Sequence, residues 1–503
     1  MKSPHKIAIV GIGGIFPGAK NPEQFWENIL ASKDCSREPP EGRWVLSLED
    51  AYASESAPDK VYSRRACFVD DFDFNPDDYG IDKRFLESLD PMFHLLLHTG
   101  QQAWRDAITD NLDKQRVGVI VGNIALPSDA SSALANEILG SKFEEQLFGQ
   151  NVKSFSSGTN RINRYVTGLP AGILARALQL GAGSYTLDAA CASSLYSLKY
   201  AVDELQSGRA DAMLCGGLSR PDSLYTQMGF SALHAISPSG HCSPFDNKAD
   251  GLVVGEGSGI VLLKRLDDAI QDGDHIYATI AGIGLSNDIE GNLMSPDSEG
   301  QLRAMQSAYQ KAGWQPGDVD LIECHGTGTP VGDAVEFQSL NSLWGERKNI
   351  DQDCVIGSVK SNVGHLLTAA GSAGLIKVLM AFKHKTLPPT ANFESSSIDL
   401  QGSPFTVLKQ ARHWEQRASD QPRRAAVSAF GFGGINAHVL LEEHNNNVKN
   451  LPDNVIQLKS KAKKDSPAIA IVGLDACFGP WDSLTKFQHR VLGSKENIAP
   501  VAP

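Results

Sequence analysis

The chain has 503 residues, of which 41% are hydrophobic and 21% are charged, and its formal net charge is −13. It is long enough to bury large cores, in one big domain or several ordinary ones. An acidic balance without a dense basic run disfavours general nucleic-acid binding, and no apolar stretch approaches the length that spans a bilayer. We therefore expect a cytoplasmic protein with no nucleic-acid partner and no membrane span.

Eight cysteines are scattered along the chain without a C-x-x-C pair. This usage fits reduced thiols in a reducing compartment and predicts neither a disulfide framework nor a metal site.

Residues 7–10 are predicted to form the first strand, directly after a short polar start without a secretory signal. Gly11, Gly13 and Gly14 follow, which raises the alternative of a dinucleotide-binding turn. Phe16 stands where the third glycine of G-x-G-x-x-G belongs. We therefore prefer a tight turn beside a buried strand.

Residues 184–188 are predicted to form a strand, and apolar residues recur at helical spacing from Leu195 to Leu205 before Gly208. Cys191 therefore lies where a strand turns into a helix. The unpaired N–H groups and the dipole at a helix start favour a thiolate, which makes Cys191 a candidate nucleophile. Taken alone, a cysteine is more often a small buried core residue, and the residues further along the chain decide against that alternative.

Two histidines follow predicted strands and enter glycine-rich turns: His325 after 319–324 and His365 soon after 355–359. Such positions lie at the open end of a sheet, where layered α/β proteins build active sites. Each could be structural by itself. Together with Cys191 they form a set suited to nucleophilic catalysis.

Four ordered blocks around these residues resemble the signatures of β-ketoacyl synthases of the thiolase superfamily: DAACASS, HGTGTPVGD, KSNVGHLLTAAG and GFGGINAH. The resemblance runs from about Lys6 to about Glu443. The stretches IAIVGIGGIFPGAKNPEQFW, SRRACFVDDFDFNPDDYGID and SPSGHCSPFDNKADGLVVGEGSG are similar to type I ketosynthases of polyketide and bacterial polyunsaturated-fatty-acid synthases. The resemblance implies an α/β, thiolase-like, five-layered α-β-α-β-α fold made of two similar halves.

The resemblance also implies a reaction, the decarboxylative condensation of an acyl group on Cys191 with malonyl-acyl carrier protein. His325 and His365 would bind the enolate, and the backbone N–H groups of Cys191 and Phe432 would bind the oxyanion. Lys360 would organise the site. Glu336 is its expected carboxylate partner, since a buried lysine needs one.

Substrate contacts are predicted at four positions: Thr327, Thr329, Phe230 and Phe432. The two threonines would bind the phosphopantetheine arm of the carrier, although a simple turn role is equally open. Met228 and Phe230 would line an acyl tunnel, with core packing as the alternative. Phe432 would also gate the pocket. No tightly bound cofactor is implied, because the substrates arrive on the carrier protein.

Three other classes share parts of this pattern. A thiolase would use a second cysteine as its base, and a ketosynthase primed by coenzyme A would carry asparagine in place of the second histidine. A non-catalytic chain-length factor would lack the nucleophile. The Cys-His-His set disfavours all three for residues 1–443.

The start of the chain recurs near its end. After a polar stretch, 444–465, that we interpret as a linker, the segment SPAIAIVG echoes the opening, with Ala470 following Ala8 by 462 positions. We expect 466–503 to be the truncated start of a second ketosynthase-like domain resembling a chain-length factor, in a fragment of a longer protein.

Related enzymes are dimers, so we expect a homodimer or a pseudo-dimer with the chain-length-factor domain. The other expected partner is an acyl carrier protein, and such carriers are acidic. Lys60, Arg64 and Arg65 form a small cluster that could contact it, with a solvated charged loop as the simpler interpretation.

Overall fold

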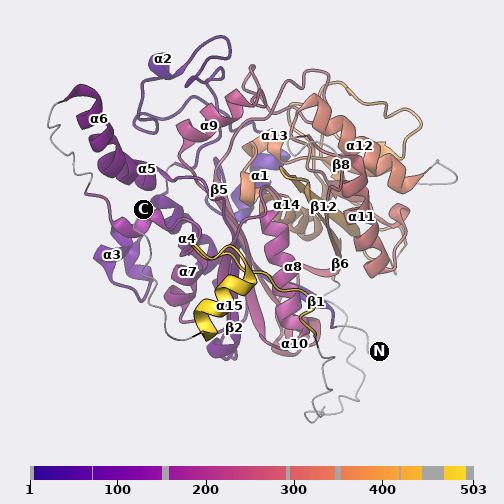
Figure 1. Ribbon diagram of the computed structural model, residues 1–503. Helices are drawn as coiled ribbons and strands as arrows, with labels where there is room; N and C mark the ends of the chain where they lie inside the picture. Colours follow the sequence, from indigo (N-terminus) through magenta and orange to yellow (C-terminus); the bar gives the residue numbers. More distant parts are fainter. Residues whose placement is uncertain are drawn as a thin grey trace. The chain divides into compact units, whose positions relative to one another are not determined.

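The computed structural model describes residues 5–70, 72–149, 158–290, 295–345, 353–418, 421–444 and 469–493 (Figure 1). The chain divides into two units, Met1–Asn447 and Val448–Pro503, and each is described by itself.

The first unit is built on one sheet of eleven strands within the described ranges, in the order β10-β8-β7-β12-β13-β6-β1-β5-β4-β2-β3. The strands of its N-terminal half are β1 (Ile7–Ile15), β2 (Val117–Gly122), β3 (Ser184–Leu187), β4 (Ala212–Ser219) and β5 (Gly257–Arg265). Those of its C-terminal half are β6 (Ala278–Asn287), β7 (Leu321–Glu323), β8 (Cys354–Gly357), β10 (Phe405–Thr406), β12 (Arg424–Gly431) and β13 (Ile435–Glu442). A separate ribbon pairs β9 (Thr386–Leu387) with β11 (Arg412–His413).

The two halves have the same topology. The N-terminal order β3-β2-β4-β5-β1 corresponds to the C-terminal order β8-β7-β12-β13-β6. In both halves the first three strands are parallel and the next two pairings are antiparallel. The antiparallel pairing of β1 with β6 joins them. The predicted division into two similar halves is therefore confirmed.

Helices fill the layers on both sides of each half-sheet. The bounds of the longer helices are α1 (Pro22–Leu30), α4 (Pro91–Asp106), α5 (Asp129–Ala135), α6 (Ser141–Phe148), α7 (Pro170–Leu178), α8 (Ser193–Gln206), α9 (Ser223–Ala232), α10 (Leu266–Asp272), α11 (Ser298–Ala312), α12 (Pro330–Trp344) and α14 (Ala370–His384). The short ones are α2 (Leu48–Ala51), α3 (Lys83–Glu87) and α13 (Lys360–Val363).

Two helices lie between the half-sheets and set the layer order. α8 and α14 contact strands of both halves, whereas α4 and α7 cover the outer face of the first half and α11 and α12 that of the second (Figure 1). The result is the predicted five-layered α-β-α-β-α arrangement. α14 is buried along nearly its whole length, as a central helix must be, because it has no solvent face.

The N-terminal glycines lie inside a strand, so the predicted tight turn is wrong. Gly11 and Gly13 belong to β1, and a Cβ atom on either would come within about 2 Å of a backbone oxygen of α4: 2.2 Å from Ala103 O and 2.0 Å from Thr99 O. The glycines therefore allow α4 to pack closely on the strand, and they form no phosphate-binding turn.

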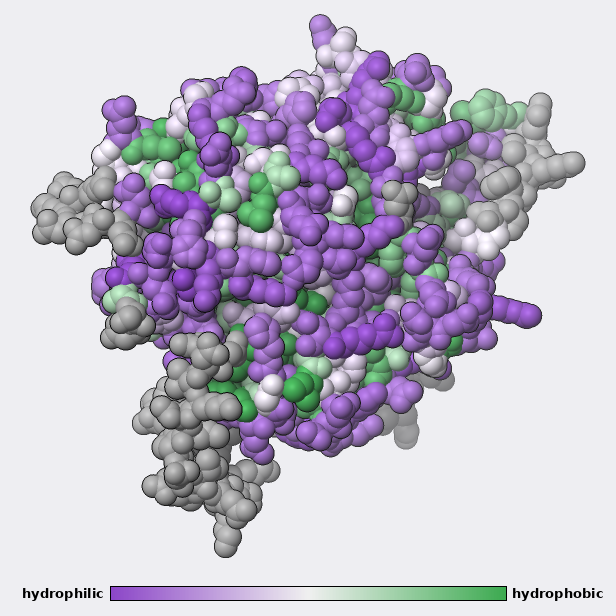
Figure 2. All heavy atoms as spheres, turned by 180° about the vertical axis from the view of Figure 1, so that it is seen from behind, coloured by the Kyte–Doolittle hydropathy of each residue, from purple (hydrophilic) through white to green (hydrophobic). Residues whose placement is uncertain are grey.

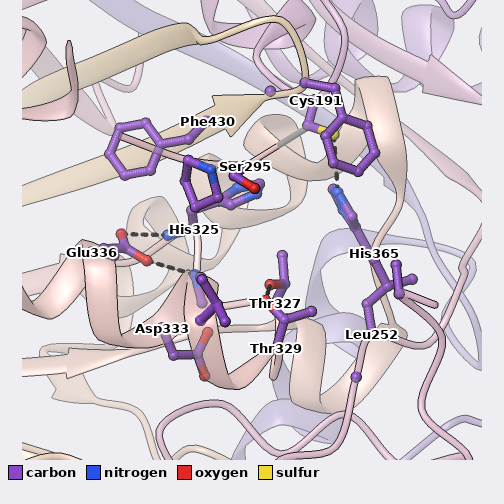
Figure 3. A pocket seen from close by; sticks show the side chains of 18 of the residues that line it. Cys191, Leu252, Ser295, His325, Thr327, Thr329, Asp333, Glu336, His365 and Phe430 are labelled. Atoms are coloured by element: carbon purple, nitrogen blue, oxygen red, sulfur yellow. Dashed lines mark hydrogen bonds between the residues drawn. The ribbon is translucent and has the colours of Figure 1, made fainter. Parts of the chain in front are cut away.

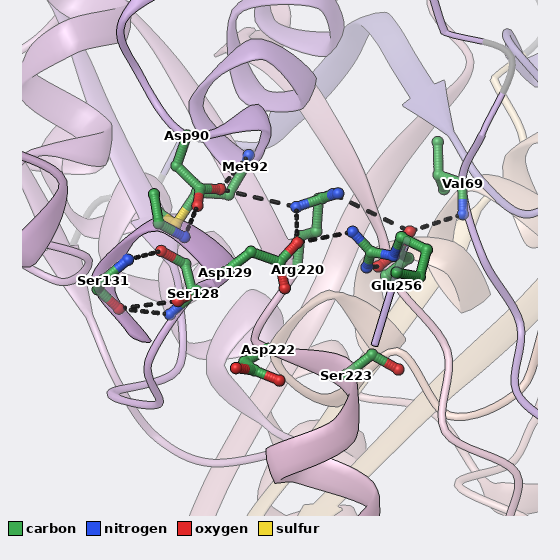
Figure 4. Close-up of polar contacts among 12 residues, drawn as sticks. Val69, Asp90, Met92, Ser128, Asp129, Ser131, Arg220, Asp222, Ser223 and Glu256 are labelled. Carbon is green, nitrogen blue, oxygen red and sulfur yellow. Dashed lines mark hydrogen bonds and ion pairs between the residues drawn. The ribbon is translucent and has the colours of Figure 1, made fainter. Parts of the chain in front are cut away.

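A buried network of charges ties loops of the first half together (Figure 4). The Asp129 carboxylate lies 2.7 Å from the Arg43 guanidinium and 2.8 Å from that of Arg220, and Glu256 and Asp90 lie on the other sides of the arginines. Burial raises the pKa values of Asp129 and Glu256 despite these partners. Because Arg220 comes just before α9, the network holds the helix that carries Phe230.

One face of the molecule is drawn by the hydropathy of its residues (Figure 2). The face in Figure 2 is mostly hydrophilic, with hydrophobic residues in separate small areas. In the described ranges no helix is long and apolar enough to cross a membrane.

The second unit repeats the local conformation of the N-terminus. A bridge joins Phe478 to Trp481, Ser483 caps α15 (Leu484–Leu492), and the rings of Phe478 and Phe487 lie 4.8 Å apart. The counterparts, each 462 positions earlier, are the bridge from Phe16 to Ala19, the Asn21 cap of α1 and the contact of Phe16 with Phe25 at 4.3 Å. The linker predicted at 444–465 lies almost wholly outside the described residues, and the second domain stays a prediction.

The closest strand-to-helix packing gives a test of the fold. A Cβ atom at Gly284 of β6 would lie 1.8 Å from the Ala304 oxygen of α11, so Gly284→Ala should lower the free energy of unfolding by about 1–3 kcal/mol in urea titrations. Gly317→Ala is the control, since its Cβ would meet nothing within 4 Å. Equal stability of the two variants would contradict this packing.

Candidate active site

Cys191 lies in a sharp turn between β3 and α8. Ala190, just before it, has a φ of +48°, an unusual conformation for a residue with a side chain. The Asp188 carboxylate holds this turn by accepting the backbone N–H groups of Ala190 at 2.9 Å and Ala125 at 2.8 Å. Cys191 is buried and comes directly before the first turn of α8, as its sequence context predicted.

The ionisation state of Cys191 differs from the prediction. Burial raises the pKa of its thiol to about 11, although Lys360 and the backbone N–H groups of Phe432 and Cys191 itself act to lower it. The expected thiolate is therefore wrong for the resting protein. The helix start does not offset the loss of water around the sulfur, because desolvation is the largest effect on a fully buried group.

Both predicted histidines face Cys191 in one pocket (Figure 3). The Nε2 atom of His365 lies 3.1 Å from the Cys191 sulfur, and the rings of His325 and His365 meet edge to face with centroids 5.3 Å apart. Burial and then the charge of Lys360 hold the pKa of each histidine well below its usual value. Both rings are therefore neutral at physiological pH.

Glu336 supports the site in a different way from that predicted. Its carboxylate accepts the backbone N–H groups of His325 and Gly326, each at 2.8 Å (Figure 3), and it forms no ion pair with Lys360 within 4 Å in the described part of the chain. The expected direct pairing is wrong. Burial raises the pKa of Glu336 to about 7, and the charge of Lys360 lowers it.

Phe432 approaches Cys191 through its backbone. A Cβ atom on the preceding Gly431 would lie 3.0 Å from both the Cys191 nitrogen and the Ala190 Cβ. Glycine therefore lets these two segments of the backbone come this close without displacing either of them. The backbone N–H groups of Phe432 and of Cys191 itself each act to lower the pKa of the Cys191 thiol. Both donors therefore lie on the side of the sulfur.

The pocket has a volume of about 360 Å³ and is lined mainly by apolar groups. Thr327 and Thr329 line it with their hydroxyl oxygens 2.9 Å apart, and the rings of Phe230 and Phe432 lie 6.1 Å apart. Met228 lies outside the pocket and packs beside Trp44 and Leu224 instead, so its predicted place in the tunnel is wrong.

Several polar residues of the pocket were not singled out from the sequence, among them Asp333, Asn436 and Asp288. Asp333 accepts the N–H groups of Phe245 and Gly328, and burial raises its pKa to about 6. Asn436 donates to Asp288 at 2.7 Å. Asp333 and Asn436 lie within the quoted blocks and could have been noted there, whereas nothing near Asp288 marked it.

The basic cluster is largely engaged within the chain. Lys60 donates to the Asp50 carbonyl, Arg65 to Ser36, and Arg64 lies over the Tyr52 ring. In the described ranges no group of three His, Cys, Asp or Glu side chains is arranged to hold a metal.

A duplicated five-layered fold, with one cysteine facing two histidines across the halves, defines the thiolase-like class of acyl-transferring enzymes. The β-ketoacyl synthase N-terminal domain matches residues 5–269, the C-terminal domain of the same family matches 277–394, and the ketoacyl-synthetase C-terminal extension matches 395–472. The chain belongs to the β-ketoacyl synthase family.

Curated relatives and solved structures that are similar to this chain support its place in this family. Polyketide synthase PksN of Bacillus subtilis is 36% identical over 88% of this chain, and a polyunsaturated fatty acid synthase polypeptide of Thraustochytrium is 33% identical over all of it. The chain spans only 8% and 24% of these relatives. A structure titled PfaC keto synthase-chain length factor is 35% identical with a TM-score of 0.87, covering 98% of this chain and 53% of its own.

The raised pKa of Cys191 predicts an unusual pH profile for its alkylation. Because only the thiolate reacts, its rate with iodoacetamide should keep rising by about tenfold per pH unit from pH 7 to 10. Lys360→Met should lower the rate throughout, since Lys360 favours the thiolate. Labelling of Cys191 followed by mass spectrometry measures this, and a plateau below pH 8 would contradict it.

Proposed function

We propose that this chain catalyses the decarboxylative condensation of an acyl group on Cys191 with malonyl-acyl carrier protein, giving a β-ketoacyl-acyl carrier protein in polyunsaturated fatty acid or polyketide biosynthesis. The 3.1 Å approach of His365 Nε2 to the Cys191 sulfur, with His325 beside it in the same pocket, carries the proposal. Cys191 can attack a thioester, and the two histidines can then stabilise the carbanion of the second substrate.

The first step is acyl transfer to Cys191. The sulfur attacks the carrier thioester, a new S–C bond forms, and the bond to the carrier sulfur breaks. The thiol proton passes through His365 to the leaving carrier thiolate, because a thiol with a pKa of about 11 must lose its proton as it attacks. The Nε2 atom of His365, 3.1 Å from the sulfur, is the nearest group that can relay it.

The second step is loss of carbon dioxide from the malonyl group. The bond to the carboxylate breaks, and its electron pair forms an enolate on the thioester oxygen. Neutral imidazoles at His325 and His365 donate hydrogen bonds to that oxygen. The apolar lining favours the step, since a carboxylate leaves as neutral carbon dioxide and little water competes for the donors.

The third step forms the carbon–carbon bond. The carbanion attacks the acyl carbonyl on Cys191, and the oxyanion receives the N–H groups of Cys191 and Phe432, which lie on the side of the sulfur. Collapse breaks the C–S bond and expels the Cys191 thiolate, which takes a proton from solvent water and restores the thiol. Lys360 organises these groups electrostatically, and Glu336 holds the His325 turn.

The proposed partner is an acyl carrier protein whose phosphopantetheine arm lies along Thr327 and Thr329, with the acyl chain toward Phe230. We place the reaction in the cytoplasm. The multidomain synthases among the relatives support a carrier within one large assembly.

Variants of Cys191 and His325 test the reaction. Cys191→Ala should form no acyl-enzyme by mass spectrometry, because it lacks the accepting sulfur. His325→Ala should still be acylated, since His325 does not contact the sulfur, but should release carbon dioxide from malonyl-acyl carrier protein about 10²-fold more slowly. Acyl-enzyme on Cys191→Ala, or normal decarboxylation by His325→Ala, would refute the proposal.

We also propose that the unit pairs with a second ketosynthase-like unit, either a copy of itself or the chain-length-factor-like domain. Two features support this. β3 ends the sheet with Tyr185 42% exposed, and α6 presents Phe143, Leu147 and Phe148 to solvent, each more than 60% exposed. An open strand edge and an apolar helix face are features that proteins normally cover.

Substitution of this face tests the pairing. Phe143→Ser with Leu147→Ser should turn a dimer of the full chain into a monomer in sedimentation velocity, because the contact loses its apolar area. Ile289→Ser, at a 75% exposed residue elsewhere, is the control and should leave the dimer intact. Unchanged sedimentation of the double variant would contradict this surface.

A further inference from the structure

A buried ion pair outside the pocket lining joins two elements that lie next to site residues in the sequence. The Lys377 ammonium on α14 lies 2.7 Å from the Glu323 carboxylate at the end of β7, and both side chains are 2% exposed. Neither residue lines the pocket. Glu323 comes two residues before His325, and α14 begins five residues after His365.

The second oxygen of Glu323 reaches a third element. Glu323 Oε1 accepts the backbone N–H of Val359 at 2.7 Å, and Val359 directly precedes Lys360. The bonded residues lie where β7 and β8 run parallel, with Glu323 opposite Gly357. One carboxylate therefore ties the start of the Lys360 segment to the strand that leads to His325.

The surroundings are shaped to admit this side chain. A Cβ atom on Gly374, one turn before Lys377 on α14, would lie 2.8 Å from Glu323 Cγ. Glycine at 374 therefore leaves the space that Glu323 occupies, and any larger residue would displace it. Cys324 also donates its N–H to the Gly357 carbonyl at 2.8 Å, which holds the two strand ends together.

We propose that Glu323 is a positioning residue of the condensation site: anchored by Lys377, it fixes the backbone at Val359 and thereby the place of the Lys360 ammonium relative to Cys191 and both histidines. The inference rests on the proposed function only for its effect on decarboxylation. Its effect on the Cys191 thiol stands independently, since Lys360 acts on that sulfur in the resting protein.

Two double variants of the full chain separate this role from a merely structural one. Glu323→Met with Lys377→Met removes the ion pair and the acceptor for Val359. Glu323→Gln with Lys377→Met also removes the ion pair but keeps an amide oxygen for Val359. Both leave no unpaired buried charge, the usual cause of misfolding after such changes.

The methionine double variant should react with iodoacetamide about tenfold more slowly at Cys191 below pH 9, equivalent to about one unit in the thiol pKa. Its release of carbon dioxide from malonyl-acyl carrier protein should fall by about 10²-fold in kcat with little change in KM, because misplacement by about 1 Å has effects of this size. The glutamine double variant should remain near wild type in both assays.

Lys264→Met with Asp272→Asn and Asp274→Asn is the matched control, because Lys264 pairs with both carboxylates. The Lys264–Asp274 pair is also fully buried with its atoms 2.7 Å apart, but it lies on β5 and the loop after α10. Equal behaviour of the two Glu323 variants, or the same loss in the control, would overturn the inference. Failure of the wild-type chain to decarboxylate would instead refute the proposed function, and the alkylation rates would still decide the role of Glu323.

Discussion

Burial has the largest effect on the pKa of each titratable group discussed in this site, and the positive charge of Lys360 is a further influence that all of them share. The Lys360 ammonium lies among Cys191, two histidines and two carboxyl groups without a close ion-pair partner in the described structure. Its field therefore reaches all of them: it favours the thiolate, opposes protonation of the histidines and favours the ionised carboxyl groups. A tight pair with Glu336 would have confined that field to one residue.

The duplicated topology explains why these groups meet. Cys191 follows β3, and Lys360 and His365 follow β8, the equivalent strand of the other half. His325 follows β7, which pairs in parallel with β8. The carboxyl ends of parallel strands lie at one edge of a sheet, and the pairing of the halves brings the two edges together. The central helices α8 and α14 then bury the site from behind.

Much of this arrangement could be predicted from the sequence. The blocks around Cys191, His325, His365 and Phe432 indicated the fold, its two halves and the residues of the pocket, because local chemistry and family resemblance are both written in short motifs. The predictions that the structure contradicts concern properties that no short motif determines. The ionisation of Cys191 and the place of Met228 depend on burial and on contacts between segments more than a hundred residues apart, which no local pattern encodes. Glu336 differs from its prediction for a more local reason, since its carboxylate accepts the N–H groups of His325 and Gly326.

The structural roles of several glycines also could not be predicted from the sequence. Gly11 and Gly13 suggested a turn, yet they lie in a strand pressed against α4, and Gly374 became meaningful only when Glu323 was seen beside it. A glycine in the sequence indicates a position with little room for a side chain, but the sequence does not identify the atoms that pack against it.

The sequence separation between Cys191 and His365 determines how late the site can form during synthesis and folding. The two residues are 174 positions apart, so a ribosome must release most of the C-terminal half before they can meet. Contacts of such long range form late in folding. Until then the cysteine lacks both the histidine beside it and the burial that raises the pKa of its thiol. The thiol of a nascent chain, still in water, therefore ionises more readily than the buried thiol of the folded unit.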